Sequence, residues 1–296
     1  MMRRKYWRPK REEFVKFAKR ISDDPHFIDG YVIGGELART KFPKRLLDWA
    51  KTRERPIIFA VGRDAIPLLK TLFIERCISR SNVPVKFIGV SGDHPKLKDL
   101  KNAVEELRGT RLEDLVYEYG GLVPGIAGRK RYENVKKAKE DLLWEIHEIE
   151  RAKGIEASRD LAEGIDKIAR EIGARNIILA DWGHTGTHPI VLATGLWKRG
   201  WGIENIHTGM AFAKEPANRI HEVIGGVINP RDEEAIKAVN MGEFAPKIMG
   251  PYAEVNRPAG LHPERRDAWA AFIHGVERGY LEHRTSKQVT RKTGNC

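Results

Sequence analysis

The chain has 296 residues, of which 41% are apolar and 32% are charged, and its formal net charge is +12. This composition excludes low-complexity and disordered proteins, and the length allows one large domain or two. No apolar run approaches the roughly 20 residues of a membrane-spanning helix, and charges occupy the N-terminal positions where a signal peptide is apolar. We therefore expect a cytoplasmic protein without membrane contact.

The positive charge is concentrated at the two ends of the chain. Residues 1–20 carry a net +7 and residues 282–296 a net +3, which leaves only +2 for the middle. Basic termini can bind nucleic acid through its phosphates, and Tyr6 and Trp7 could stack on bases. The near-neutral middle has no recognised nucleic-acid-binding motif. Nucleic-acid binding by the termini is therefore an alternative to a function of the central domain.

The two cysteines do not indicate thiol chemistry. Cys77 and Cys296 allow one disulfide at most, and neither belongs to a CxxC motif. This pattern argues against redox catalysis and cysteine-bound zinc, and it fits a reducing compartment.

Residues 1–50 predict a basic helical segment. Phe14, Phe17 and Ile21 keep helical spacing, and the spacing resumes after Pro43. Between these stretches, Asp29-Gly30 and Gly34-Gly35 predict turns on either side of the short apolar run Tyr31-Val32-Ile33.

Four apolar runs predict buried strands. They span residues 56–62, 83–90, 176–181 and 204–212, and helical patterns separate them, beginning with the one at residues 66–74. Apolar strands alternating with helices are typical of an α/β fold with an open, mostly parallel sheet covered on both faces.

The segment between the second and third predicted strands is too long for one crossover helix. Residues 96–174 contain two apolar stripes with helical spacing, so we expect a helical insertion that caps the sheet, with residues 120–128 as its mobile hinge. A late helix at residues 266–282 is expected to dock back onto the domain. The predicted parts are residues 1–50 (N-terminal helical segment), 51–95 with 175–215 (sheet core), 96–174 (insertion) and 216–296 (C-terminal extension).

Two loops follow predicted strands at the edge of the sheet where ligands of open parallel sheets bind. The first is Gly62-Arg63-Asp64, and the second spans residues 182–188. In the second loop, glycines would let the backbone approach a ligand, threonines offer hydroxyl groups, and a helix opened by Pro189 would favour an anion. The simpler alternative is a tight turn with Thr187 or His188 as the helix N-cap. The residues of this possible phosphate cradle are Gly183, His184, Thr185, Gly186, Thr187 and His188.

The two loops and their strands resemble a known family. The sequence NIILADWGHTGTHPIVLATGLWKRGWGIENIHTGMAF is similar to the phosphoribosyl-diphosphate loop region of type I phosphoribosyltransferases. RPIIFAVGRDAIPLLKTLF resembles the earlier strand and diphosphate-contacting loop of that family, and VPVKFIGVS lies where its next strand would be.

The resemblance implies a role for each loop residue. Asp181 would match the second carboxylate of a pair that contacts the ribose hydroxyls with Mg²⁺, and the diphosphate side would be formed by Gly62, Arg63 and Asp64. Ala180 stands at the first acidic position of the family, which weakens the implied magnesium–ribose recognition. The residues that would surround the ribose 5-phosphate are Thr185, Gly186, Thr187 and His188.

A second resemblance concerns the same residues. Residues 59–64 and 181–187 are similar to paired xRDG and DxGxxGT motifs of uncharacterised bacterial proteins, which look like relatives of this fold. This resemblance implies no reaction. It groups Arg63, Asp64 and Asp181 with Gly183 in one constellation.

Other chemistry is possible for the acidic and histidine side chains. His184 and His188, with His94 at another strand end, could bind a metal or shuttle protons, although loop histidines are commonly solvated or capping residues. Asp64 or Asp181 could act as a nucleophile or general base in a dry pocket. An ion pair with Arg63 would be the structural alternative for Asp64.

The leading hypothesis is a phosphoribosyltransferase-like enzyme acting on a phosphorylated ribose, sugar or nucleotide. Asp181 would stabilise an oxocarbenium-like centre, and Arg63 with Mg²⁺ would hold the leaving diphosphate. Asp64 and His184 complete the candidate catalytic residues. A noncatalytic sensor of a phosphorylated ligand is the alternative that Ala180 favours. The sequence indicates no oligomeric state.

Overall fold

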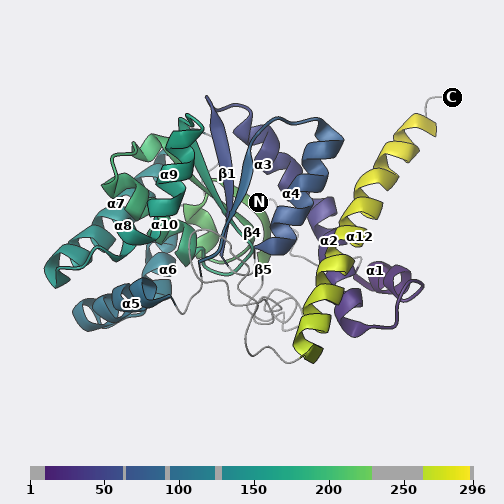
Figure 1. Cartoon of the computed structure of the whole chain (residues 1–296), viewed down its shortest axis with the longest axis horizontal. Helices are drawn as coiled ribbons and strands as arrows, with labels where there is room; N and C mark the ends of the chain where they lie inside the picture. The colour runs from purple at the N-terminus through teal and green to yellow at the C-terminus, as the bar shows by residue number, and fades with distance from the viewer. Residues whose placement is uncertain (1–10, 63–64, 91–93, 124–128, 229–262, 294–296) are drawn as a thin grey trace.

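The computed structural model describes residues 11–62, 65–90, 94–123, 129–228 and 263–293, which form a sheet between two layers of helices (Figure 1). Its five strands are all parallel, in the order β2-β1-β3-β4-β5. The expected α/β class, with a helical insertion and a C-terminal helical extension, is therefore confirmed.

The strands are apolar because helices cover both faces of the sheet. The first and third predicted strands agree with the structure to within one residue, whereas the second is shorter at both ends. The fourth begins two residues later than predicted, since η1 (Ile203–Asn205) forms a 3₁₀ turn before it. A fifth strand, in the part assigned to the C-terminal extension, was not predicted. The strands are β1 (Pro56–Val61), β2 (Val85–Ile88), β3 (Asn176–Asp181), β4 (Ile206–Lys214) and β5 (Val223–Ile228).

Most of the helices from the long connection cover one face of the sheet, together with α10 (Thr187–Lys198). Their buried side chains share a hydrophobic core with Ile57, Phe59 and Leu179 of the strands. The connection is therefore a helical layer continuous with the sheet, while its role as a cap over a ligand stays a prediction. Its helices are α5 (Pro95–Arg108), α6 (Leu112–Leu122), α7 (Arg129–Lys153), α8 (Ala157–Leu161) and α9 (Glu163–Glu171).

The first part of the expected hinge is helical. Gly120 and Gly121 lie within α6, and a Cβ added to Gly120 would lie only 2.5 Å from the carbonyl oxygen of Pro216. Gly120 is therefore a packing residue beside η2 (Ala217–Ile220). Residues 124–128, the rest of the expected hinge, lie outside the described residues.

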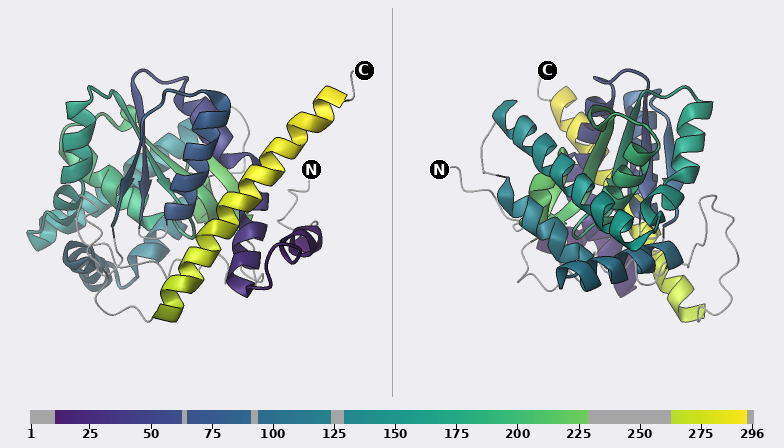
Figure 2. Two further views of the ribbon diagram at one scale, coloured as in Figure 1. Left: turned by 45° about the vertical axis from the view of Figure 1, so that its right-hand side comes forward. Right: turned by 90° about the vertical axis from the view of Figure 1, so that its left-hand side faces the viewer.

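The opposite face is covered by N-terminal helices and by the C-terminal helix α12 (Pro263–Thr293), which runs along them (Figure 2). Trp269, Phe272 and Val276 of α12 join the hydrophobic core on this face, so the expected docking of the late helix is confirmed. The other helices here are α1 (Arg11–Ala18), α2 (Pro25–Thr40), α3 (Phe42–Ala50) and α4 (Ile66–Ser79).

The predicted turns at Asp29-Gly30 and Gly34-Gly35 are wrong, because both dipeptides lie inside α2. These glycines serve helix packing. A Cβ on Gly30 would lie 2.0 Å from the Phe272 carbonyl oxygen, and one on Gly34 would lie 2.1 Å from that of Val276. A Cβ on Gly279 of α12 would lie 2.2 Å from the Tyr31 carbonyl oxygen. The small residues let the backbones of α2 and α12 come into contact. A turn prediction that uses only neighbouring residues cannot include this contact, because α12 is distant in the sequence.

Within the part of the chain that the structure describes, no helix combines the length and apolarity needed to cross a membrane.

We predict that Gly34→Ala lowers the free energy of unfolding by about 2–3 kcal/mol, because the new methyl group forces α2 away from α12. Gly121→Ala is the matched control, since a Cβ there meets only one side-chain atom, at 4.0 Å. That control should be neutral or stabilising by up to about 1 kcal/mol. Chemical denaturation of both variants tests the packing, and equal effects would contradict it.

Candidate functional site

The loops after β1 and β3 lie side by side at a topological switch point. β1 pairs with β2 on one side and with β3 on the other, and Val61 is opposite Asp181 in the β1–β3 register. In open parallel sheets, ligands bind beyond the carboxyl ends of the strands at such a switch point. The structure thus brings Gly62 and the loop at residues 182–186 to one edge, as the sequence predicted.

Only the beginning of the first loop is described. Gly62 has a φ of 98°, in the left-handed region that favours glycine, and its N–H donates to the Ile88 carbonyl over 3.0 Å. Arg63 and Asp64 lie outside the described residues, so their position and roles stay predictions.

The second loop is anchored in the core by Trp182. Its side chain is fully buried and packs edge-on against Phe212 of β4 and Phe272 of α12, with ring centroids 5.4 and 6.5 Å away. Asp181, only 3% exposed, accepts a 2.7 Å hydrogen bond from the Trp182 N–H through Oδ1. The carboxylate expected to contact ribose therefore also fixes the base of its own loop.

The loop then follows β4 and turns into α10. The Lys214 N–H donates to the His184 carbonyl over 3.0 Å. His184 and Gly186 both have a φ of 74°, so the backbone turns sharply twice, and the half-buried Thr185 and the buried Thr187 bring their hydroxyl oxygens within 2.7 Å of each other. This geometry places hydroxyls and the N-terminus of α10 at the switch-point edge.

The start of α10 differs from the expectation. The helix begins at Thr187 rather than at Pro189, and Gly186 is its N-cap, so neither Thr187 nor His188 has that position. Gly186 occupies the N-cap position in the left-handed conformation, with a φ of 74°, which glycine adopts without a Cβ clash. His188 is half-buried in the first turn of the helix. Pro189 is compatible with an early helical position because N–H groups there have no partner within the helix.

A buried ion pair, Lys139–Glu222, lies beside the part of β4 that precedes its pairing with β5. The β4–β5 register starts at Gly209 opposite Val223, so the earlier β4 residues, which pair with β3 on one side, have no β5 partner on the other. Lys139 of α7 donates to the Ile206 carbonyl over 2.8 Å and also bonds Glu222. Glu222 in turn accepts the Thr208 N–H over 2.8 Å. Both charged side chains are at most 5% exposed, so they replace strand pairing inside the protein.

This pair is connected to the candidate site loop through two further side chains. The Thr208 hydroxyl oxygen lies 2.9 Å from Glu222 Oε2 and 3.0 Å from His221 Nδ1. His221 Nε2 lies 3.3 Å from the Thr185 carbonyl oxygen. A Cβ on Gly186 would lie 2.3 Å from the same ring nitrogen, so the loop rests directly against the imidazole.

The pKa values of this network reflect its burial. Burial lowers the pKa of His221 to about 4, although the contact with the Thr185 carbonyl opposes the change. Burial alone would raise the pKa of Glu222, but the charge of Lys139, together with the contacts of Glu222 with His207 and Lys139, holds that pKa well below the usual range. The network therefore contains a neutral imidazole and an ionised carboxylate at neutral pH.

The sequence contains one weak signal for this network. Lys139 lies on α7 between the buried Val135 and Leu142, so a charge interrupts an apolar stripe. Such a position often needs a buried partner. His221, Thr208 and Glu222 carry no local signal, because only the β4–β5 register brings them together.

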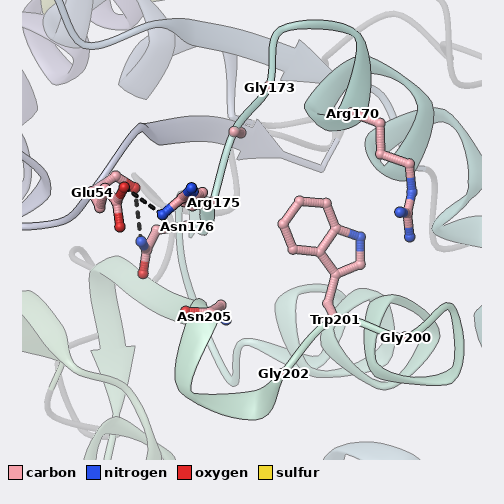
Figure 3. Close-up of a pocket in the computed structure, with 10 residues that line it drawn as sticks. Glu54, Arg170, Gly173, Arg175, Asn176, Gly200, Trp201, Gly202 and Asn205 are labelled. Atoms are coloured by element: carbon pink, nitrogen blue, oxygen red, sulfur yellow. Dashed lines mark hydrogen bonds and ion pairs between the residues drawn. The ribbon is translucent and has the colours of Figure 1, made fainter.

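Two cavities lie at the opposite, amino-terminal edge of the sheet. The larger, about 700 Å³, is shown in Figure 3, where the Glu54–Arg175–Asn176 cluster and Trp201 line it. The smaller, about 390 Å³, adjoins it and includes Arg53. The polar groups of the larger cavity are largely bonded to one another, since Glu54 accepts from Arg175 and Asn176, and Trp201 donates to Asp166. We therefore place the candidate site at the switch point, away from the larger cavity.

The structure gives one predicted histidine a structural role. His94 is the N-cap of α5, and its Nδ1 accepts the Lys96 N–H over 3.3 Å. Burial and the neighbouring Lys96 lower the pKa of His94. Among the described residues, no group of three or more His, Cys, Asp or Glu side chains is arranged to hold a metal ion.

Neither protein-family models nor curated proteins match the sequence.

We predict that Lys139→Met lowers the free energy of unfolding by about 3–5 kcal/mol, because it leaves Glu222 charged and buried without a cation. Lys136→Met, one turn away on α7, is the control. Lys136 pairs with Glu140 over 3.7 Å at the surface, where both side chains are 40% exposed, so its loss should cost under about 1 kcal/mol. Urea denaturation of the two variants compares them, and a similar small loss for both would contradict a structural role of the pair.

We also predict an acid-dependent loss of stability that depends on His221. Between pH 6.5 and pH 4 the unfolded chain protonates this histidine and the folded protein does not, so unfolding becomes easier as the pH falls through this window. The contribution lost is about 3 kcal/mol. His221→Gln should flatten the pH dependence of the unfolding free energy by this amount. The exposed His274→Gln should retain the wild-type slope, and identical slopes for all three proteins would refute the prediction.

Proposed function

We propose that the switch-point edge binds a phosphorylated ribose, sugar or nucleotide in the manner of type I phosphoribosyltransferases. The supporting observation is the adjacency of β1 and β3, whose loops meet where open parallel sheets bind ligands. The resemblance of the same two loops to the family supports the phosphate as the recognised group.

The described residues supply suitable groups for a phosphate. Thr185 and Thr187 offer hydroxyl groups 2.7 Å apart, and the turn at Gly186 directs the N-terminal end of a twelve-residue helix, α10, to the same edge. Hydroxyl groups and helix N-termini both favour an anion. Gly183 and Gly186 would allow the ligand to lie against the backbone.

Catalysis is less strongly supported than binding. Ala180, in place of the first acidic residue of the family, is fully buried in the core on the α12 side of the sheet. Asp181 is present, and its Oδ1 is hydrogen-bonded to the Trp182 N–H. Mg²⁺ fits this edge only with Asp181 and oxygens of the ligand phosphates together, since magnesium is commonly held by one or two carboxylates and substrate phosphates. When bound, the ion would neutralise developing phosphate charge.

For transfer chemistry, the chain's own groups would act electrostatically. Asp181 would orient the ribose hydroxyls and stabilise positive charge at the anomeric carbon, and Thr185 would hold the 5-phosphate. Arg63 would hold the leaving diphosphate. A protein that keeps the phosphate contacts without turnover would be a sensor, the alternative that Ala180 favours.

Binding is tested by thermal unfolding with ribose 5-phosphate, phosphoribosyl diphosphate and a nucleoside monophosphate, each with and without Mg²⁺. We expect at least one to raise the Tm, since a ligand of the folded state stabilises it. The isosteric Thr185→Val should weaken that ligand about tenfold by removing one hydrogen bond to a charged group. Thr194→Val is the control, because its hydroxyl bonds the Ile190 carbonyl within α10. No shift with any ligand in either condition would refute the proposal.

Turnover is measured separately, as diphosphate release from phosphoribosyl diphosphate with a panel of nucleobases. Release that is lost in Asp181→Asn while binding persists would support the transferase. Binding without release would instead support the sensor.

A further inference from the structure

His221 is a buried titratable group that contacts the candidate site from outside it. It is fully buried in the segment between η2 and β5. Its ring nitrogens lie beside the Thr208 hydroxyl and the Thr185 carbonyl. The charged groups facing it are Glu222, its neighbour in the sequence, and Lys139 from α7.

With a neutral imidazole, both of these contacts cannot be hydrogen bonds while the Thr208 hydroxyl also donates to Glu222, from which it lies 2.9 Å away. The Thr185 carbonyl can only accept, so a bond to it requires a proton on His221 Nε2. Nδ1 then has only its lone pair, and the Thr208 hydroxyl must donate to it. Because that hydroxyl has a single hydrogen, it can no longer donate to Glu222.

The other neutral tautomer has the opposite consequence. With the proton on Nδ1, His221 donates to Thr208, and Thr208 donates to Glu222. The Nε2 lone pair then faces the Thr185 carbonyl oxygen at 3.3 Å, and the loop loses its bond. Only a protonated ring could donate to both Thr185 and Thr208, and burial disfavours that charge.

Glu222 can lose the Thr208 hydroxyl without becoming unpaired. It keeps the Thr208 N–H at 2.8 Å and the ammonium group of Lys139. Within the part of the chain that the structure describes, the Thr185 carbonyl has no comparable substitute for the imidazole. The balance of contacts therefore favours the proton on Nε2.

We propose that His221 is a positioning residue for the loop at residues 183–187, which it holds through the Thr185 carbonyl as the Nε2–H tautomer. The loop rests against the ring, since a Cβ on Gly186 would lie 2.3 Å from Nε2 and 2.9 Å from the sulfur of Met210. The Nε2–H tautomer is thus the form that holds the Thr185 carbonyl, and with it the loop backbone, against the ring. The link to ligand binding rests on the proposed function of this loop, whereas the positioning itself does not.

The first test needs no ligand. Long-range ¹H–¹⁵N spectra of the full-length protein at pH 7 should show His221 protonated at Nε2 and unprotonated at Nδ1. An Nδ1–H tautomer would overturn the proposal. This measurement uses the wild-type chain, so it does not depend on whether any variant folds.

The second test separates hydrogen bonding from packing by hydrogen exchange of the amides at residues 183–188. His221→Phe keeps a large ring without hydrogen bonds, and we expect exchange there to become about tenfold faster, the equivalent of one lost hydrogen bond. His221→Gln keeps an uncharged N–H donor and should restore protection to within about threefold of wild type.

The matched control is His207→Gln. His207 is also buried, but it bonds Asn176 over 3.1 Å at the amino end of β3 and approaches the network only at Glu222, whose Oε1 lies 3.8 Å from its Nδ1. Its replacement should leave the exchange of residues 183–188 unchanged. Equal protection in wild type and His221→Phe would overturn the positioning role, as would a His221→Gln variant as defective as His221→Phe.

Ribose 5-phosphate, measured by calorimetry on the same proteins, separates this inference from the proposed function. We expect affinity to fall about tenfold in His221→Phe and to recover in His221→Gln. If exchange behaves as expected and no protein binds ribose 5-phosphate, phosphoribosyl diphosphate or the nucleoside monophosphate, the positioning stands and the proposed function fails. If all the proteins bind equally and exchange is unchanged, the function stands and the positioning fails.

Discussion

The late start of β5 is the constraint on which the candidate site depends. Since β5 pairs with β4 only from Gly209 onward, the preceding backbone groups of β4 need other partners inside the protein. Lys139 and Glu222 provide them as a buried pair. Such a pair is costly to bury and more costly to break, so it fixes where α7 lies against the sheet edge. The same carboxylate bonds Thr208, which connects the pair to His221.

Three separate contacts hold the loop after β3 at the switch point. Trp182 fixes its beginning in the core beneath α12, and the bond from Lys214 to His184 fixes its middle to β4. The contact of His221 with Thr185 fixes its end, where the chain enters α10. Contacts with α12, with β4 and with the segment before β5 therefore hold this loop in place. A ligand bound there would meet a preformed backbone rather than one that it must first order.

The predictable parts of the structure are those with local causes. Continuous apolar runs identified four strands, because a sheet covered on both faces needs apolar residues on both sides of each strand. The regular stripe that includes Leu142 and Ile146 identified α7 for the same reason. β5 was not predicted because Gly225 and Gly226 interrupt its apolar run. Its existence also depends on pairing with β4.

The sequence by itself determined the fold class and the glycine- and threonine-containing loop after Asp181, because hydrophobic burial and backbone conformation leave local patterns. Tertiary structure alone decided that Gly30 and Gly34 are helix-packing residues rather than turns, since the neighbouring backbone of α12 lies more than 200 positions away in the sequence. It likewise decided that His221 contacts the loop. The hydrogen-bond partners of a buried polar group are residues that the folded chain brings together, so the spacing of residues in the sequence does not predict them.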